Sequence, residues 1–245
     1  MFPEIASFGP FSLHSYGLLI AAGVFFSLFL MVRAASRYGF PPSDKVFDLV
    51  FVVVVTGFAG GRVLYVIQEW GWYREHPWEM IQIWKGGLIY TGGVIGSLIG
   101  VMVFGRLARL APLALLDFAI PYVALTHSFG RVGCFLNGCC YGKACDLPWA
   151  VQFPFLPGPV HPTQIYEAIF NLALFGFLAW RYPRRRFEGE GFANYLMIYG
   201  TGRFFLEFLR GDQFPVFFFL TPQQIFSFAF LLAGMMLYGI CGRKR

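Results

Sequence analysis

Seven long apolar runs constrain what this chain can fold into more than any other feature of its sequence. They lie at about residues 13–32, 46–67, 87–105, 113–131, 163–181, 191–209 and 222–240. A helix needs about 20 mostly apolar residues to cross a bilayer. The runs are too long, and alternate too little, to be strands of a lipid-facing barrel. We therefore predict an all-α, polytopic integral membrane protein with about seven transmembrane helices.

The composition supports this class of protein. Hydrophobic residues make up 57% of the 245 residues and charged residues only 13%, whereas a soluble domain carries about 25% charged residues. The same figures exclude a disordered chain, and five cysteines in so long a chain do not indicate a small disulfide-stapled scaffold. We expect one transmembrane domain over residues 1–245, with an extracytoplasmic loop at 131–162 that contains a cysteine cluster.

The basic residues are divided unequally between the two sets of loops. Twelve lie in one set: Arg33, Arg37, Lys45, Arg106, Arg109, Arg181, Arg184, Arg185, Arg186, Arg243, Lys244 and Arg245. Five lie in the other: Arg74, Lys85, Arg131, Lys143 and Arg210. Because cytoplasmic loops carry the excess of Lys and Arg, we predict that the N-terminus is outside and the C-terminus is cytoplasmic. No basic patch belongs to a soluble domain, so we expect no nucleic-acid partner.

Several charged residues lie within the apolar runs or at their ends, where an ionisable group is costly and is usually functional. Arg62 is in the second run, Arg131 ends the fourth, and Arg203 and Glu207 lie four residues apart in the sixth. Arg203 and Glu207 could form a structural ion pair on one helical face. Alternatively, the arginines hold an anionic substrate such as a phospholipid head group, because a planar guanidinium binds two phosphate oxygens together. We favour the second interpretation.

Glycines gather in two regions of the sequence. One region holds Gly86-Gly87 and Gly92-Gly93-Val94-Ile95-Gly96, and the other holds Gly130, Gly133, Gly138 and Gly142. Such clusters allow helices to pack closely, or they bring backbone close to a ligand. Both interpretations remain open.

Four cysteines lie within twelve residues: Cys134, Cys139, Cys140 and Cys145. Their loop is expected outside the cytoplasm, where disulfides persist, so our leading interpretation is one or two disulfides that brace the loop. A thiol–disulfide redox role, nucleophilic catalysis and metal binding are the alternatives. The spacing lacks the paired Cys-x-x-Cys typical of structural zinc sites. We therefore assign no metal, and we expect no cofactor.

The segment from His127 to Gly138 resembles the signature of the prolipoprotein diacylglyceryl transferase family, Gly-Arg-x-Gly-Asn-Phe-x-Asn-x-Glu. Further blocks are similar to other motifs of the family. They follow one another in family order: His14-Ser15-Tyr16-Gly17, Gly60-Gly61-Arg62, Trp84 to Gly93, His161-Pro162-Thr163-Gln164-Ile165-Tyr166-Glu167, and Tyr199 to Arg210. Each block is weak by itself, but together they are strong evidence of homology.

The resemblance implies a multi-pass enzyme of the bacterial inner (plasma) membrane. Such enzymes move the diacylglyceryl group of phosphatidylglycerol to the lipobox cysteine of a prolipoprotein signal peptide and form a thioether. The expected partners are therefore phosphatidylglycerol, the prolipoprotein and the lipid bilayer. By the resemblance, Arg131 and Arg203 contact the phosphate and stabilise the charge that grows on it, and Glu207 orients Arg203 or accepts a proton. The residues expected to bind substrate are Tyr16, Arg62, Thr91, Asn137, Gly142, Tyr199 and Arg210.

Three positions depart from the family pattern. Cys134 replaces an Asn, Cys139 replaces a Glu, and Thr91 replaces a His that is a natural candidate for deprotonating the thiol. His127, one helical turn before Arg131, is a candidate replacement base, although it could equally be a hydrogen-bonded packing residue. Two alternative functions follow: a non-catalytic phospholipid-binding or phospholipid-translocating homologue, and a membrane thiol–disulfide oxidoreductase that uses the cysteine cluster.

Overall fold

The structure is a computed structural model that describes residues 4–8, 11–82, 86–213 and 219–243, with side chains from residue 15 onward. The chain divides into two compact units. The first unit contains Met1–Met31 and Asp117–Arg245, and the second contains Val32–Leu116. The single transmembrane domain predicted from the sequence stays a prediction.

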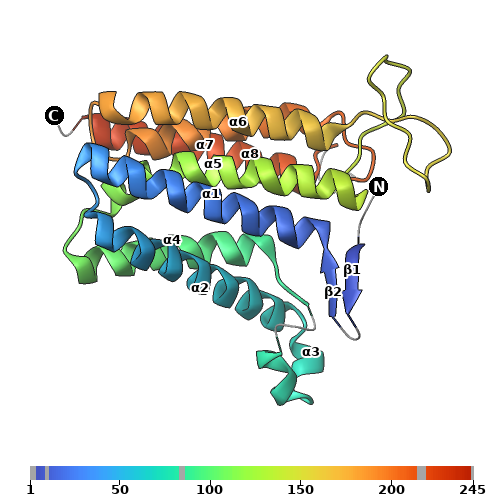
Figure 1. Cartoon of the computed structure of the whole chain (residues 1–245), viewed down its shortest axis with the longest axis horizontal. Coiled ribbons are helices and arrows are strands. Elements are labelled where there is room, and N and C mark those ends of the chain that lie inside the picture. The colour runs from blue at the N-terminus through green and yellow to red at the C-terminus, as the bar shows by residue number, and fades with distance from the viewer. Residues whose placement is uncertain (1–3, 9–10, 83–85, 214–218, 244–245) are drawn as a thin grey trace. The chain divides into compact units, whose positions relative to one another are not determined.

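Each of the seven apolar runs coincides with a long helix (Figure 1). The elements are β1 (Glu4–Phe8), β2 (Phe11–His14), α1 (Ser15–Tyr38), α2 (Ser43–Gln68), α3 (Trp70–Tyr73), η1 (Pro77–Ile81), α4 (Tyr90–Ala108), α5 (Pro112–Asn137), α6 (Thr163–Arg181), η3 (Tyr182–Arg184), α7 (Glu190–Glu207) and α8 (Pro222–Gly242). The antiparallel hairpin of β1 and β2 was not predicted, so the fold is helical but not strictly all-α. Because α5 continues to Asn137, the loop predicted to start at residue 131 starts at 138.

Five helices of the described chain are long and apolar enough to cross a membrane: α1, α2, α4, α5 and α8. The predicted class, a helical membrane protein, is therefore confirmed. The predicted number of seven spans is not shown, because α6 and α7 are outside this set. The physical reason is that both helices carry buried charged residues, which include Glu167 on α6 and Arg203 and Glu207 on α7.

The core of the first unit lies where α5, α6 and α7 meet. It consists of Ile120, Ala124, Leu174, Leu178, Tyr195 and Tyr199. Helices α7 and α8 also lie against each other (Figure 1). A Cβ atom added at Gly200 would lie 2.6 Å from the carbonyl oxygen of Ser227, so this glycine permits the close approach of α7 and α8.

Asp117, which weakens the apolar character of the fourth run, caps the start of α7. Its carboxylate accepts hydrogen bonds from the backbone N–H of Gly189 at 2.7 Å and from that of Phe192 at 2.9 Å. Asp117 is fully buried. A carboxylate at this position satisfies N–H groups that a helix leaves unpaired and interacts favourably with the helix dipole. The charge therefore has a structural role.

In the second unit, glycines on α2 and α4 bring these two helices together. A Cβ atom at Gly60 would lie 2.4 Å from the carbonyl oxygen of Gly92, and one at Gly96 would lie 2.2 Å from that of Thr56. Real Cβ atoms do not approach backbone oxygen so closely, so these positions require glycine. For Gly92 and Gly96 the packing interpretation is confirmed.

Arg62 organises the segment between α2 and α4. Its guanidinium group donates to four backbone carbonyl oxygens, those of Glu79 at 2.6 Å, Met80 at 2.9 Å, Gly86 at 2.6 Å and Gly87 at 3.1 Å. The two glycines have φ values of 84° and 80°, which only glycine adopts without strain. Arg62 is buried and bound to backbone in its own unit, and its predicted role in substrate binding stays a prediction.

Candidate active site

A buried charge cluster joins three helices of the first unit, and Glu167 of α6 is at its centre. Its Oε1 atom lies 3.0 Å from Nη2 of Arg131 on α5 and 3.6 Å from Nε of Arg203 on α7. The Glu167 side chain is 3% exposed. A charge so deeply buried needs opposite charges around it, and the two arginines supply them. The fold therefore brings Arg131 and Arg203 to the same carboxylate, from positions 72 residues apart.

His127 and Tyr199 complete the surroundings of Glu167. The Tyr199 hydroxyl donates to Glu167 Oε1 at 3.4 Å, and His127 Nε2 lies 3.6 Å from the same oxygen. Arg131 Nε donates to His127 Nε2 at 3.2 Å. Since a guanidinium group can only donate, Nε2 is the acceptor nitrogen of a neutral imidazole. The nitrogen with which His127 would accept a proton is thus already hydrogen-bonded, which weakens its predicted role as a base.

Arg203 lies between two carboxylates. Besides Glu167, its Nη1 atom lies 2.7 Å from Oε2 of Glu207, one helical turn further along α7. The other oxygen of Glu207 accepts a hydrogen bond of 2.8 Å from the Thr221 hydroxyl at the start of α8. The Arg203 side chain is only 5% exposed, whereas that of Arg131 is 16% exposed. Arg131 is therefore the more accessible of the two arginines.

Arg210 follows α7 and makes a two-pronged ion pair. Its Nε and Nη2 atoms donate to the two carboxylate oxygens of Asp212, both at 2.8 Å. Burial alone would lower the pKa of Arg210, but the hydrogen-bonded Asp212 carboxylate, together with Cys140 and Glu207, outweighs burial and raises the pKa. Arg210 is thus a firmly charged group close to the end of the helix that carries Arg203 and Glu207.

The loop after α5 is tied to both neighbouring segments through Gly142. The Gly142 N–H donates to the carbonyl of His161 at 2.9 Å, and Gly142 forms an antiparallel bridge with Arg210. A Cβ atom at Gly142 would lie 2.6 Å from Cβ of His161 and 2.8 Å from the carbonyl oxygen of Leu209. Gly142 therefore has a packing reason to be glycine, and its predicted contact with substrate stays a prediction.

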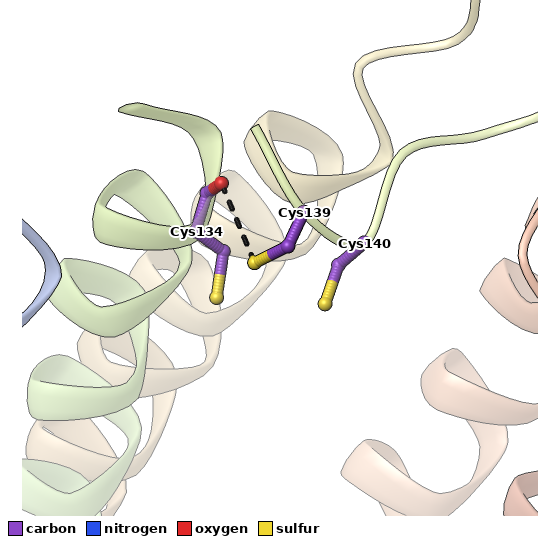
Figure 2. A group of neighbouring side chains, drawn as sticks. All are labelled: Cys134, Cys139 and Cys140. Atoms are coloured by element: carbon purple, nitrogen blue, oxygen red, sulfur yellow. Dashed lines mark hydrogen bonds between the residues drawn. The ribbon is translucent and has the colours of Figure 1, made fainter. Parts of the chain in front are cut away.

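Three of the four clustered cysteines come together where this loop begins (Figure 2). The Sγ atoms of Cys134, Cys139 and Cys140 all lie within 4.8 Å of one another, and Cys145 is not part of this group. All five cysteines of the chain are free thiols. None of the disulfides predicted for the loop is formed in this structure.

The Cys140 thiol has an unusual environment within this group. The neighbouring thiols of Cys134 and Cys139, together with the positive charges of Arg210 and Arg131, outweigh burial and lower the pKa of Cys140 well below its ordinary value. The lowered pKa favours the thiolate form of Cys140. The group of three thiols lies one helical turn beyond Arg131, because Cys134 follows it by three residues on α5.

The remaining predicted substrate residues are distributed over both units. In the first unit, the exposed Tyr16 is the second residue of α1, and a Cβ atom at Gly133 would lie 3.2 Å from its Cα atom, so Tyr16 lies beside α5. Asn137 is exposed at the last position of α5. Thr91 is half-buried at the start of α4 in the second unit. The roles predicted for these residues are still predictions.

Glu167 and Thr221 are important residues that sequence reasoning missed. Glu167 was noted only as the end of the block that starts at His161, although it lies within an apolar run and satisfies the rule used to select Arg203. The rule that charged residues within apolar runs are usually functional therefore also selects Glu167 when it is applied to every run. Thr221 precedes a Pro and is followed three residues later by Gln224, and this is the sequence signature of a capping box. The signature predicts the start of a helix but gives no indication of the contact with Glu207.

The fold and the cluster together define a class of protein: a helical membrane protein with a buried cluster of arginines and carboxylates. The family model described as prolipoprotein diacylglyceryl transferase matches residues 3–240. Relatives include proteins named phosphatidylglycerol–prolipoprotein diacylglyceryl transferase from Clostridium tetani and Chromohalobacter salexigens. The first is 35% identical over 93% of this chain and 93% of its own length. The second is 36% identical over 96% and 90%. The chain belongs to the prolipoprotein diacylglyceryl transferase family.

Proposed function

We propose that this protein transfers the diacylglyceryl group of phosphatidylglycerol to the lipobox cysteine of a prolipoprotein and forms a thioether. The observation that carries the proposal is the cluster of Arg131, Glu167 and Arg203. These residues come from three separate blocks that resemble family motifs. The fold brings the two arginines to within 3.6 Å of one carboxylate oxygen of Glu167. Relatives from several bacteria are named for this transfer.

The chemistry of the transfer fits the cluster. The acceptor thiolate attacks the glycerol carbon that carries the phosphate ester, so that a C–S bond forms and the C–O bond to phosphate breaks. The electron pair of that bond stays on the leaving glycerol phosphate, whose negative charge grows in the transition state. Arg131, partly exposed and fixed by Glu167, donates to the phosphate oxygens. Arg203, held on both sides by carboxylates, keeps Glu167 in place.

The proposal includes seven transmembrane spans, with the N-terminus outside and the C-terminus in the cytoplasm of a bacterial inner membrane. Helices α6 and α7 have 19 and 18 residues. At 1.5 Å per residue, each is about 27–29 Å long, close to the hydrocarbon thickness of about 30 Å. Helix α7 packs along α8, which is apolar enough to span the membrane. We therefore expect α7 to lie at the same depth in the membrane as α8.

Two native cysteines test the orientation. Cys145 lies in the loop placed outside, and Cys241 lies near the basic C-terminal end placed inside. In intact cells, a membrane-impermeant maleimide is expected to label a variant that keeps only Cys145 and to spare one that keeps only Cys241. The reverse pattern would contradict the proposed orientation.

Transfer is tested with purified protein, labelled phosphatidylglycerol and a lipobox peptide. Removal of one preorganised donor to a developing negative charge costs about 100- to 1,000-fold in rate. We expect a loss of this size for Arg131→Ala and none for Arg106→Ala, which removes an exposed arginine on α4. Lipid binding without transfer from any anionic donor would overturn the proposal and favour the non-catalytic phospholipid-binding alternative.

A further inference from the structure

The group formed by Cys134, Cys139 and Cys140 has the arrangement of a metal site. Figure 2 shows the three side chains converging from the last turn of α5 and from the loop after it, with their sulfur atoms directed to the same side. The Sγ atoms lie within 4.8 Å of one another. Cys145, which lies in the same loop, is not part of the group.

The backbone holds the two loop cysteines in place. Gln164 Nε2 donates to the carbonyl oxygen of Cys139 at 2.7 Å, and the Thr163 hydroxyl donates to that of Cys140 at 2.8 Å. Both donors are buried residues in the first turn of α6. Cys140 has a φ of 66°, which is strained for a residue with a side chain and persists only where its surroundings enforce it. The backbone positions of the two loop cysteines are therefore imposed by the fold.

The donor set favours zinc. Zinc binds thiolates at about 2.3 Å in tetrahedral geometry, so bound sulfur atoms lie about 3.8 Å apart. The three Sγ atoms are at most 4.8 Å apart, so side-chain movements of about 1 Å bring them to the separation found in a zinc site. Among the described residues, the group contains three ligand side chains. A zinc ion with three protein ligands keeps a fourth position for an exchangeable ligand, as catalytic zinc sites do.

Charges beside the group would balance the thiolates. A zinc ion with three thiolates has a net charge of −1, and buried charge needs compensation. Arg131 lies one helical turn before Cys134 on α5. Arg210 is buried and is bridged to Gly142, two residues after Cys140. These arginines make the environment suitable for a negatively charged metal centre.

We propose that Cys134, Cys139 and Cys140 bind a zinc ion, and that the fourth position on the zinc takes the acceptor thiol. This revises the absence of a metal expected from the sequence, and its second part rests on the proposed transfer function. The acceptor thiol loses its proton to water when it binds zinc, since a coordinating thiol is deprotonated. Its sulfur then forms the C–S bond while the C–O bond to phosphate breaks and the electron pair stays on phosphate. Nothing is oxidised or reduced in this step.

The first test measures metal independently of activity. The intact protein, purified in detergent without chelator, is analysed for zinc per chain by mass spectrometry. We expect about one zinc ion in the parent chain and in Cys145→Ser, and a loss of zinc in Cys139→Ser and in Cys140→Ser. Cobalt(II) added to the zinc-free parent should produce a thiolate-to-cobalt charge-transfer band. Because the cobalt band is measured on the parent chain, it does not depend on whether a variant folds. No zinc and no such band, or a disulfide between two of the three cysteines, would overturn the site.

The second test concerns the acceptor thiol. Removal of zinc with a chelator should lower transfer to the lipobox peptide at least tenfold, and added zinc should restore it. Cys241→Ser, a control far along the sequence, should transfer at the parent rate. If the protein binds zinc but removal of the zinc leaves transfer unchanged, the role of zinc in thiol activation is overturned. A zinc-loaded protein that binds phosphatidylglycerol but never transfers it would overturn the proposed function and leave the metal site standing.

Discussion

Glu167→Gln tests whether one carboxylate holds the charge cluster together. The substitution keeps the size of the side chain and removes its negative charge. It leaves Arg131 without its carboxylate partner and leaves Arg203 with Glu207 alone. Since the position is only 3% exposed, water cannot replace the lost charge. We expect the protein to remain folded at low temperature and to unfold much more easily.

The distances set the size of this effect. At an effective dielectric constant of about 20, a charge pair at 3.0 Å or at 3.6 Å contributes roughly 5 kcal/mol. The cost of burying the carboxylate, which is several kcal/mol, offsets a large part of the gross attraction. Breaking a buried pair by removing one partner costs about 3–5 kcal/mol. For a chain of this size, that corresponds to a fall in melting temperature of roughly 6–20 °C.

Thermal unfolding in one detergent measures the effect, with Glu188→Gln as the matched control because Glu188 is exposed. Arg131→Gln and the double variant Arg131→Gln/Glu167→Gln complete a double-mutant cycle. If the pair interacts as the structure indicates, the double variant loses less stability than the sum of the two single losses. Additivity within about 0.5 kcal/mol, or a Glu167→Gln variant as stable as Glu188→Gln, would refute the central role of Glu167.

Two further predictions concern the fold. Gly96→Ala places a Cβ atom 2.2 Å from the Thr56 carbonyl oxygen and is expected to destabilise the protein by about 1–3 kcal/mol. In the same unfolding assay Gly176→Ala, which has open space around it, should be neutral or slightly stabilising; equal behaviour of the two variants would contradict the packing of α2 on α4. Asp117→Asn removes the charge that caps α7 and should cost about 1–2 kcal/mol. Hydrogen exchange of the first-turn amides of α7 should become faster, and unchanged protection would contradict the cap.

The helices could be predicted because each one is encoded locally. A run of about 20 apolar residues specifies a membrane helix almost without regard to its surroundings, and the seven runs accordingly match α1, α2 and α4 to α8. The hairpin before α1 was missed because its strands are short and carry no long-range signal. The dipeptide Gly9-Pro10, a turn signal, lies between them in the sequence and was the available indication.

Most members of the site were predicted one by one, but Glu167, Thr221 and the arrangement of the site were not. The cost of charge in a membrane identifies Arg131, Arg203 and Glu207 one by one. No local pattern indicates that Glu167 lies between two of them, because its neighbours come from α5 and α7. The cysteines illustrate the same limit. The clustering of the cysteines in a loop expected outside the cytoplasm favoured a disulfide-braced loop, whereas the position of Cys140 involves a positive φ and a hydrogen bond from Thr163 of α6.

The sequence left a structural and a functional interpretation of the arginines open, and the surroundings of Arg131 and Arg203 differ in the structure. Arg203 is 5% exposed and has a carboxylate on each side, so its charge is already balanced within the fold. Arg131 shares a single carboxylate, is 16% exposed and lies one turn from the cysteine group. An anionic head group gains more from the arginine whose charge is less fully balanced. We therefore infer that Arg203 fixes the cluster, and that substrate contact and chemistry belong to the side of the cluster where Arg131 and the thiols lie.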